Sequence, residues 1–287
     1  MSGHVSPTVR ARRLRIELHR LRQEAGHTLQ RVADLSDGAF NAATVGRWET
    51  GDRVPRQGDL RVLLEIYGVS GDRRGALQKL AKEAKQRGWW HAHRDMLKDG
   101  FGLYVGLESE AAAVQTYQSL YVPGLLQTED YSRAAIRGIR MNEDPEGLEA
   151  KVQLRQSRQQ RLTGRDPLRL WAVLDEALVH RQVGGPTVMR EQLEKLVEQA
   201  RLPNVTLQLL PYAAGAHPAL EGPFYMLEFP DPQDAGVIYL EQATSGLALE
   251  AEDEVRRYTL MFGHLTALAL SPEETDTHLT RMIDSYR

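Results

Sequence analysis

The chain has 287 residues, a formal net charge of −3 and no cysteine. This length is too great for one small helical bundle and suits two domains, each able to bury its own core. The lack of cysteine excludes disulfides, thiol catalysis and sulfur-ligated zinc. No apolar run approaches the roughly 18 residues of a membrane helix, and the N-terminal segment is rich in arginine rather than apolar like a signal peptide. We therefore expect a cytoplasmic protein without membrane contact.

The charge is divided unevenly along the chain. Residues 1–100 hold 19 Lys and Arg against 12 Asp and Glu, whereas residues 101–287 hold 17 against 27. The basic first part is attracted to phosphate, and the acidic second part is repelled by it. The two parts therefore suit different partners.

Two amphipathic helices are predicted in the first part. Leu14, Leu18 and Leu21 recur at helical spacing, and the segment 60–67 repeats the same apolar pattern. Both helices are expected to pack on a common core. Between them, segment 28–33 predicts a further short helix; with segments 43–51 and 60–64 it gives the order helix, turn, helix, stop, helix.

The segment 41–50 predicts the helix that follows the turn. Asn41 is suited to cap its start, and Gly51 is suited to end it in a left-handed conformation. Val45 and Trp48 lie one turn apart and are expected to point into the core. The opposite side of the helix is then left for solvent or a partner.

That exposed side suits a DNA major groove. Thr44 and Arg47 are three residues apart and share the face, and the small Ala43 beside them allows close approach. A methyl group of Ala43 or Thr44 can contact a thymine methyl, while Arg47 can donate to guanine or to a phosphate. We expect binding to double-stranded DNA through Asn41, Ala43, Thr44, Arg47, Arg53, Gln30 and Arg31. The alternative is a helical bundle whose exposed arginines are merely solvated.

The residues 47–51 together with Pro55 resemble the end of the recognition helix and the next turn in the lambda-repressor-like (XRE-type) helix-turn-helix regulators. The sequence differs from the family pattern in two places. The linker 35–40 is longer than the family's usual one, which leaves the orientation of the reading helix open. Leu29 stands where many members carry a phosphate-binding glutamine, so that contact is expected to be absent.

The segment 76–107 is expected to link a helix-turn-helix DNA-binding domain, 1–75, to a regulatory and dimerisation domain, 108–287. Its first part, 76–87, predicts a helix. The adjacent Trp89 and Trp90 cannot share one helix face, so they are expected to dock on the second domain or on a partner. His91 and His93 have the spacing of a metal-binding pair on a strand, but no third ligand is arranged beside them, and we expect no metal.

The second domain mixes helices and strands. A strand, helix and strand in succession predict two parallel strands, and two later strands around a Pro-rich turn predict an antiparallel pair. The fold class expected for the whole chain is an all-α N-terminal domain followed by an α+β domain with a small mixed sheet. The expected helices are 110–117, one capped by Thr128, 148–162, 186–200, 250–270 and 272–286, and the expected strands are 168–174, 205–209, 224–229 and 236–240.

A series of segments in this domain resembles the signature of one family of regulators. The segments are 120–131, 173–178, 184–185, 192–193, 203–211 and 215–217. That family joins an XRE-type helix-turn-helix to a C-terminal domain of unknown function and is common in GC-rich actinobacteria. The resemblance covers nearly the whole chain. It implies a transcriptional regulator, often acting with a small partner protein encoded nearby, and it implies no known ligand or reaction.

Candidate residues for binding a ligand or partner in the second domain are Gln127, Glu176, His217 and Glu221, together with Trp89 and Trp90. Glu176 follows a strand, and His217 and Glu221 lie in a loop after another strand, where ligands gather in α/β sheets. Glu176 and His217 have the chemistry of a base and an acid. The alternative is that Glu176 binds backbone amides and His217 packs among its neighbours.

Gln127 has a similar pair of interpretations. It either lines a pocket at the Thr128-capped helix start, which favours anions, or simply fixes the direction of the chain. The sequence contains no GxSxG, GxxxxGK[ST] or HExxH motif. We therefore expect neither an enzyme nor a cofactor.

Two main functional hypotheses remain, beside a third in which Glu176 and His217 process a nucleotide-like ligand. The first is a homodimeric, sequence-specific DNA-binding regulator whose second domain dimerises and senses a small molecule or a small partner protein. The second is a protein-interaction module that sequesters a small partner protein, as in an antitoxin-like pair, with DNA contact secondary.

Overall fold

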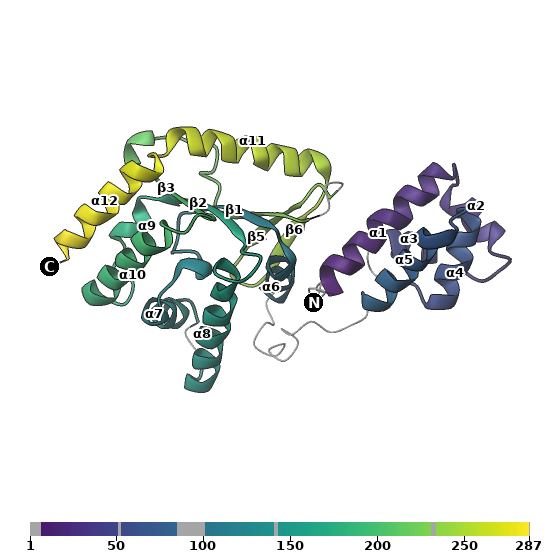
Figure 1. Cartoon of the computed structure of the whole chain (residues 1–287), viewed down its shortest axis with the longest axis horizontal. Coiled ribbons are helices and arrows are strands. Elements are labelled where there is room, and N and C mark those ends of the chain that lie inside the picture. Colours follow the sequence, from purple (N-terminus) through teal and green to yellow (C-terminus); the bar gives the residue numbers. More distant parts are fainter. Residues whose placement is uncertain (1–6, 51–52, 85–100, 141–142, 231–233, 287) are drawn as a thin grey trace. The chain divides into compact units, whose positions relative to one another are not determined.

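The computed structural model describes residues 7–50, 53–84, 101–140, 143–230 and 234–286. The chain forms two compact units. The first contains a helical bundle, and the second contains a six-stranded mixed sheet with its helices (Figure 1). This confirms the expected fold class of an all-α part followed by an α+β part.

Five helices build the first unit around one hydrophobic core. The buried residues of this core include Leu14, Leu18, Val45, Trp48 and Leu60, as the apolar spacing predicts. The helices are α1 (Pro7–Glu24), α2 (Leu29–Leu35), α3 (Ala42–Thr50), α4 (Gln57–Ile66) and α5 (Gly71–Glu83).

Helix α5 differs from its expected position. It was expected over 76–87 as part of a linker, but it begins at Gly71, directly after the extended residue Ser70. Its Leu77 and Ala81 are buried in the same core as α1 and α4. The bundle core therefore includes residues beyond 75, where the DNA-binding domain was expected to end.

The second unit is organised by a sheet with the strand order β3-β2-β1-β4-β5-β6. β1 pairs in parallel with β2, and β2 with β3, whereas β1–β4, β4–β5 and β5–β6 are antiparallel. The predicted parallel pair and antiparallel pair are thus both confirmed. The strands are β1 (Ala113–Gln118), β2 (Arg169–Asp175), β3 (Val205–Leu210), β4 (Phe224–Glu228), β5 (Val237–Glu241) and β6 (Gly246–Leu249).

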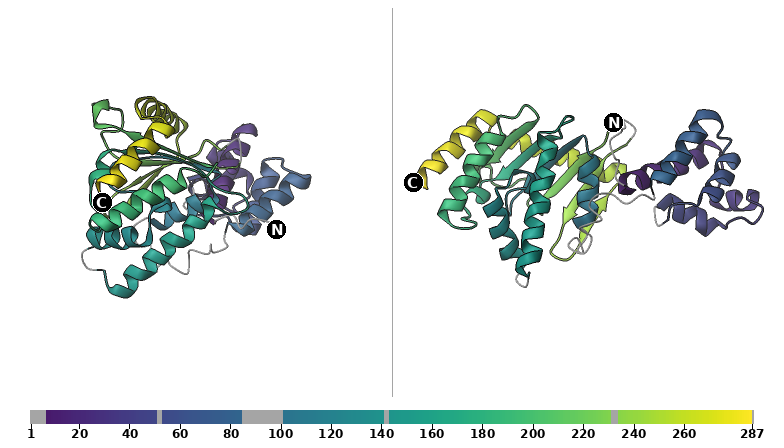
Figure 2. Two further views of the ribbon diagram at one scale, coloured as in Figure 1. Left: turned by 60° about the vertical axis from the view of Figure 1, so that its left-hand side comes forward. Right: turned by 60° about the horizontal axis from the view of Figure 1, so that its bottom comes forward.

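Helices cover both faces of this sheet (Figure 2). On one face Phe262 of α11 packs beside Trp171 and Phe224 of the strands. The opposite side carries α7, α8 and α10 (Figure 1), and α12 packs against α10 and β3. The helices are α6 (Phe101–Glu110), α7 (Glu129–Ile139), α8 (Pro145–Gln159), α9 (Ala177–His180), α10 (Pro186–Gln199), α11 (Glu252–Leu268) and α12 (Pro272–Ser285), with short 3₁₀ turns at Gly124–Leu126, Gln160–Leu162 and Tyr212–Ala214.

One expected helix is wrong. The segment 110–117 was expected to be helical, but α6 ends at Glu110 and β1 begins at Ala113. β1 has a strand on each edge, and its side chains are buried on both faces because helices lie above and below the sheet. Its polar residue Thr116 is accommodated by donating a hydrogen bond from Oγ1 to the Phe224 carbonyl, 2.8 Å away. A strand buried in this way shows no alternation, so its pattern resembles that of a helix.

No helix within the described ranges is both long enough and apolar enough to span a membrane.

Candidate functional site

Helix α3 begins as the sequence predicts. The Asn41 side chain accepts hydrogen bonds from the backbone N–H and the hydroxyl of Thr44, at 2.8 and 2.9 Å. Arg47 then donates from its guanidinium to Thr44 Oγ1 at 3.2 Å. The three side chains form one hydrogen-bonded row, while Val45 and Trp48 are buried on the other side of the helix. Thr44 and Arg47 therefore share the outer face, as expected.

The long turn before α3 is ordered by a buried serine. Ser36 donates to the carbonyl oxygen of Ala33 and accepts from the backbone N–H of Phe40. The turn also uses left-handed backbone at Asp37, with φ of 51°, and at Gly38, with φ of 81°; both residue types tolerate this region. Phe40 then packs edge-on against Trp48, with ring centroids 5.0 Å apart. The turn that departs from the resembled pattern is thus fixed to the core and orients α3.

A part-buried ion pair joins α3 to α1. Glu49 accepts two hydrogen bonds from the Arg22 guanidinium, at 2.7 and 2.8 Å, and lies 2.8 Å from His19 Nδ1. The Arg22 pKa is raised, chiefly by its hydrogen bond to Glu49. Sequence reasoning missed this contact. The signal was present, because Glu49 follows Val45 and Trp48 at the i, i+3, i+4 spacing of an inward face.

The other residues expected to contact DNA are exposed. Gln30 and Arg31 lie at the start of α2, Ala43 lies in the first turn of α3, and Arg53 follows that helix. Gln30 Nε2 donates to Asp34 Oδ1 at 2.9 Å. Their contact with DNA stays a prediction. The left-handed end expected at Gly51 lies outside the described residues.

Gln127 in the second unit is a buried hydrogen-bonding centre. Its Nε2 donates to the Val122 carbonyl at 2.5 Å, and its Oε1 accepts from Ser132 at 3.0 Å and from Arg155 at 2.6 Å. Gln127 thus fixes the chain before α7 and also holds Arg155, which agrees with the second interpretation; it is not among the residues that line the cavity described below.

Glu176 and His217 have different partners. Glu176 Oε2 accepts from the Tyr212 backbone N–H at 2.6 Å, and Oε1 lies 3.5 Å from His180 Nε2 and 3.8 Å from His278 Nε2. His217 Nε2 instead lies 3.4 Å from the Tyr117 hydroxyl. No hydrogen bond or ion pair in the described part of the chain joins Glu176 to His217.

Tyr117 connects His217 to a neighbouring carboxylate. Its hydroxyl donates to Asp175 Oδ2 at 3.0 Å. Burial raises the Tyr117 pKa, and the charge of Asp175 raises it further. Glu221, the fourth candidate, is exposed in the segment before β4. Trp89, Trp90, His91 and His93 lie outside the described residues.

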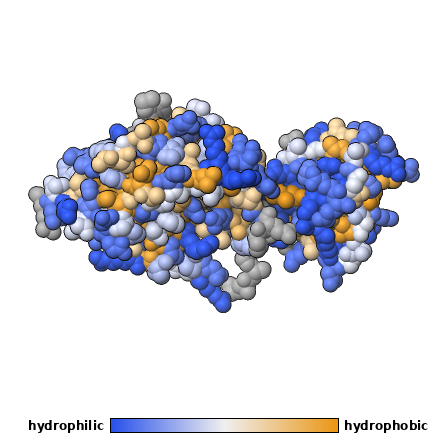
Figure 3. All heavy atoms as spheres, turned by 90° about the horizontal axis from the view of Figure 1, so that it is seen from above, coloured by the Kyte–Doolittle hydropathy of each residue, from blue (hydrophilic) through white to orange (hydrophobic). Residues whose placement is uncertain are grey.

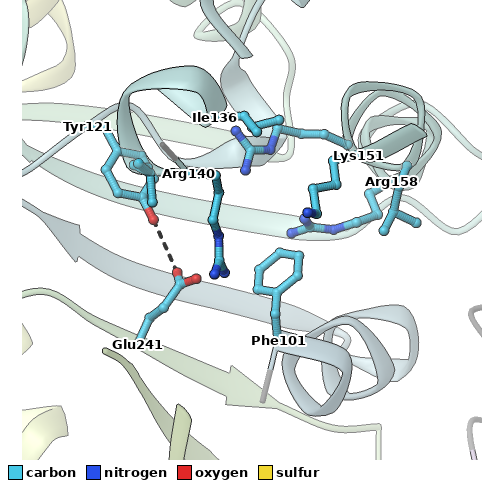
Figure 4. A pocket seen from close by; sticks show the side chains of 10 residues that line it. Phe101, Tyr121, Ile136, Arg140, Lys151, Arg158 and Glu241 are labelled. Carbon is cyan, nitrogen blue, oxygen red and sulfur yellow. Dashed lines mark hydrogen bonds between the residues drawn. The ribbon is translucent and has the colours of Figure 1, made fainter. Parts of the chain in front are cut away.

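A cavity of about 80 Å³ lies at a place the sequence did not indicate. Figure 4 shows the nitrogen-bearing ends of Arg140, Lys151 and Arg158 around the same space as the Phe101 ring and the Glu241 carboxylate. A signal for it was present in α8, where Lys151, Arg155 and Arg158 follow one another at i, i+4 and i+7 on one helix face. The lining residues are Phe101, Tyr121, Ile136, Ile139, Arg140, Lys151, Leu154, Arg155, Arg158 and Glu241.

The first unit, with its capped and exposed α3, defines the chain as a helix-turn-helix protein, and residues 13–77 match the family model described as a helix-turn-helix domain. Residues 101–281 match the model described as a domain of unknown function (DUF5753). The chain belongs to this DUF5753 family. No curated protein and no solved structure matches it.

Proposed function

We propose that this chain is a sequence-specific DNA-binding transcriptional regulator of the XRE type. The observation that carries the proposal is the hydrogen-bonded row of Asn41, Thr44 and Arg47 on the outer face of α3. The helix-turn-helix match and the excess of basic residues in 1–100 support it. In this role α3 enters the major groove, Arg47 binds a guanine or a phosphate, and Thr44 approaches a base edge.

The proposed regulator acts as a homodimer. Dimeric helix-turn-helix proteins bind two half-sites about one helical turn, roughly 34 Å, apart. Leu260 and Leu268 of α11 are 63% and 43% exposed. Figure 3 shows the molecule from above, relative to the view of Figure 1, and hydrophobic residues reach this surface among hydrophilic ones. We take these two side chains as the starting point for the proposed subunit contact.

The second unit is proposed to sense an effector, either a small molecule or a small partner protein. Acidic residues outnumber basic ones in residues 101–287, so this unit repels the DNA phosphates and is free to bind another ligand. We propose no catalytic role for Glu176 or His217, because Glu176 is engaged by a backbone amide and the two side chains have separate partners.

The test is selection of genomic DNA fragments by the purified full chain at about 150 mM salt, near physiological ionic strength. A palindromic sequence is expected, with two protected half-sites and a dimer by sedimentation. The double variant Thr44→Ala, Arg47→Ala is expected to lose specific capture, since each good base contact contributes about 1–3 kcal/mol of discrimination.

A matched control exists on α10. Thr187 and Arg190 have the same residue types and the same i, i+3 spacing as the α3 pair. The variant Thr187→Ala, Arg190→Ala removes an equal charge and is expected to select the same fragments as the parent. Protection of the same operator by the Thr44, Arg47 variant would show that α3 is not the reading helix. A monomer bound to a single site would overturn the dimer.

A further inference from the structure

The cavity in the second unit is built by elements far apart in the sequence. Phe101 comes from α6, Arg140 from the end of α7, Lys151, Arg155 and Arg158 from α8, and Glu241 from β5. Its volume of about 80 Å³ is several times the roughly 10–15 Å³ that one water molecule requires. The space is therefore large enough for a group of several heavy atoms.

Positive charge predominates in the cavity wall. Four of the lining side chains are cationic, and Glu241 is the lining carboxylate. Glu241 accepts a hydrogen bond from Tyr121 at 3.2 Å, and Lys151 is paired with Glu143 just beside the cavity. Counting Glu143 as well, the cations exceed the carboxylates by two. An anion in the cavity would lie among these cationic side chains and be attracted by them.

Two of the arginines are held rigidly. The Arg158 guanidinium stacks over the rings of Phe101 and Tyr104, at 5.0 and 5.3 Å from their centroids, and Arg158 is only 4% exposed. Arg155 is held by its 2.6 Å hydrogen bond to Gln127. Burial lowers the Arg155 pKa, and the neighbouring Arg158 charge lowers it further. Cations fixed before a ligand arrives lose little entropy when it binds.

The remaining wall is apolar. Ile136, Ile139 and Leu154 line it together with the Phe101 ring. An inorganic ion would satisfy the cations but leave these side chains without a partner. A molecule with an anionic head and a short apolar part would contact both sides of the cavity.

We propose that this cavity binds a small organic anion, whose carboxylate or phosphate group lies among Arg140, Lys151, Arg155 and Arg158 and whose apolar part contacts Ile136, Leu154 and Phe101. This proposal rests on the sensing role proposed above, and it identifies the chemical class of the effector. The bound anion would neutralise the cations of α7 and α8 and tie these two helices to α6 and β5.

The first test is calorimetric titration of the full chain, without DNA, with acetate, butyrate and inorganic phosphate in a low-chloride buffer. We expect saturable binding at one site per chain for butyrate or phosphate; which of them binds identifies the head group. Butyrate should bind about tenfold more tightly than acetate, because two further methylene groups are buried. If neither butyrate nor phosphate binds saturably, the proposal is overturned.

Variants locate the site. Arg140→Met and, separately, Lys151→Met are expected to weaken binding at least tenfold, since each removes a charged donor. Arg137→Met is the control, because Arg137 lies on the same helix as Ile136 but does not line the cavity. Equal binding by all variants would place the anion elsewhere. Thermal unfolding of each variant confirms that it is folded.

The second test separates this inference from the proposed function. A saturating concentration of the binding anion should change the affinity for the selected DNA fragment several-fold, and the change should disappear in Arg140→Met. Anion binding without any change in DNA affinity would overturn the effector role. Failure of DNA selection itself would overturn the proposed function and leave the calorimetric result intact.

Discussion

Glu49 places a charge on the inner side of a short helix, where apolar residues are the rule. Its side chain is 6% exposed, and its partner Arg22 is 14% exposed. Such a pair is compensated as long as both partners are present, because the hydrogen bonds replace those made with water. The contact also fixes the rotation of α3 about its axis, since it ties the end of this helix to α1. The outer row of Asn41, Thr44 and Arg47 is thereby held in one direction.

Removal of this charge should destabilise the helical unit. The variant Glu49→Gln keeps the side-chain size but leaves the part-buried Arg22 guanidinium without its counter-charge, which costs about 2 kcal/mol. The measurement is the midpoint of denaturant unfolding. The control is Glu24→Gln on α1, since Glu24 is 51% exposed and pairs only at 3.6 Å or more; we expect a change below about 0.5 kcal/mol. Equal midpoints for the two variants would contradict a structural role for Glu49.

At the scale of elements, hydrogen-bonded caps set where several helices begin. Thr128 accepts from the Tyr131 N–H at the start of α7, and Asp144 accepts from the Gly147 N–H at the start of α8. Ser271 and Glu274 form a reciprocal capping box on α12. Each cap satisfies a backbone donor that the helix itself leaves unpaired. Because α7 and α8 carry most of the cavity wall, their caps also position the cationic side chains.

Loss of the α7 cap should be measurable. Thr128→Ala removes the acceptor for the Tyr131 N–H and is expected to lower the free energy of unfolding by about 1 kcal/mol. Thr128→Ser keeps the hydroxyl and serves as the matched control, with most of the stability retained. Thermal or denaturant unfolding of the second unit provides the measurement. Loss of the same stability in both variants would mean that the Thr128 methyl group, rather than the hydroxyl, stabilises α7.

Local sequence signals also explain which elements were predictable. Caps and apolar spacing predicted the starts of α7 and α10 and the parallel pair of β2 and β3. β1 was missed because its burial comes from partners distant in the chain. The same reason applies to the cavity: the basic face of α8 was readable, but Phe101 and Glu241 are brought to it only by the folded sheet. Contacts within one helix can be inferred from spacing, whereas contacts between distant elements cannot.

At the scale of the whole molecule, burial of tyrosine hydroxyls links the stability of both units to alkaline pH. Tyr67 lies in the core of the helical unit, and Tyr117, Tyr121 and Tyr239 lie in the sheet unit. Burial is the largest cause of the raised pKa of each of these four side chains. A raised folded pKa means that the folded state holds the proton more strongly than the unfolded state does. Stability is therefore fully present below the unfolded tyrosine pKa of about 10 and is lost as pH rises above it.

This linkage predicts alkaline unfolding. Between pH 9 and pH 12 the melting temperature should fall, and tyrosinate absorbance should increase together with the loss of circular dichroism, because the buried hydroxyls ionise only on unfolding. Tyr239→Phe keeps the ring but removes one ionisable group, so its melting temperature should fall less steeply with pH. A melting temperature that stays constant from pH 9 to pH 12 would contradict the prediction.

The central position of β1 governs the order in which the chain can fold. Ala113 pairs with Arg169 on one side and with Glu228 on the other, so the middle of the sheet is completed only by segments made much later. Closing such long loops is slow, and the last of these partners, β4, begins only at Phe224, whereas the contacts among α1–α5 all lie within residues 7–83. During synthesis the helix-turn-helix bundle can therefore fold while the sheet is still open. A ribosome-bound chain would then present the helix proposed to read DNA before the unit proposed to regulate it is complete.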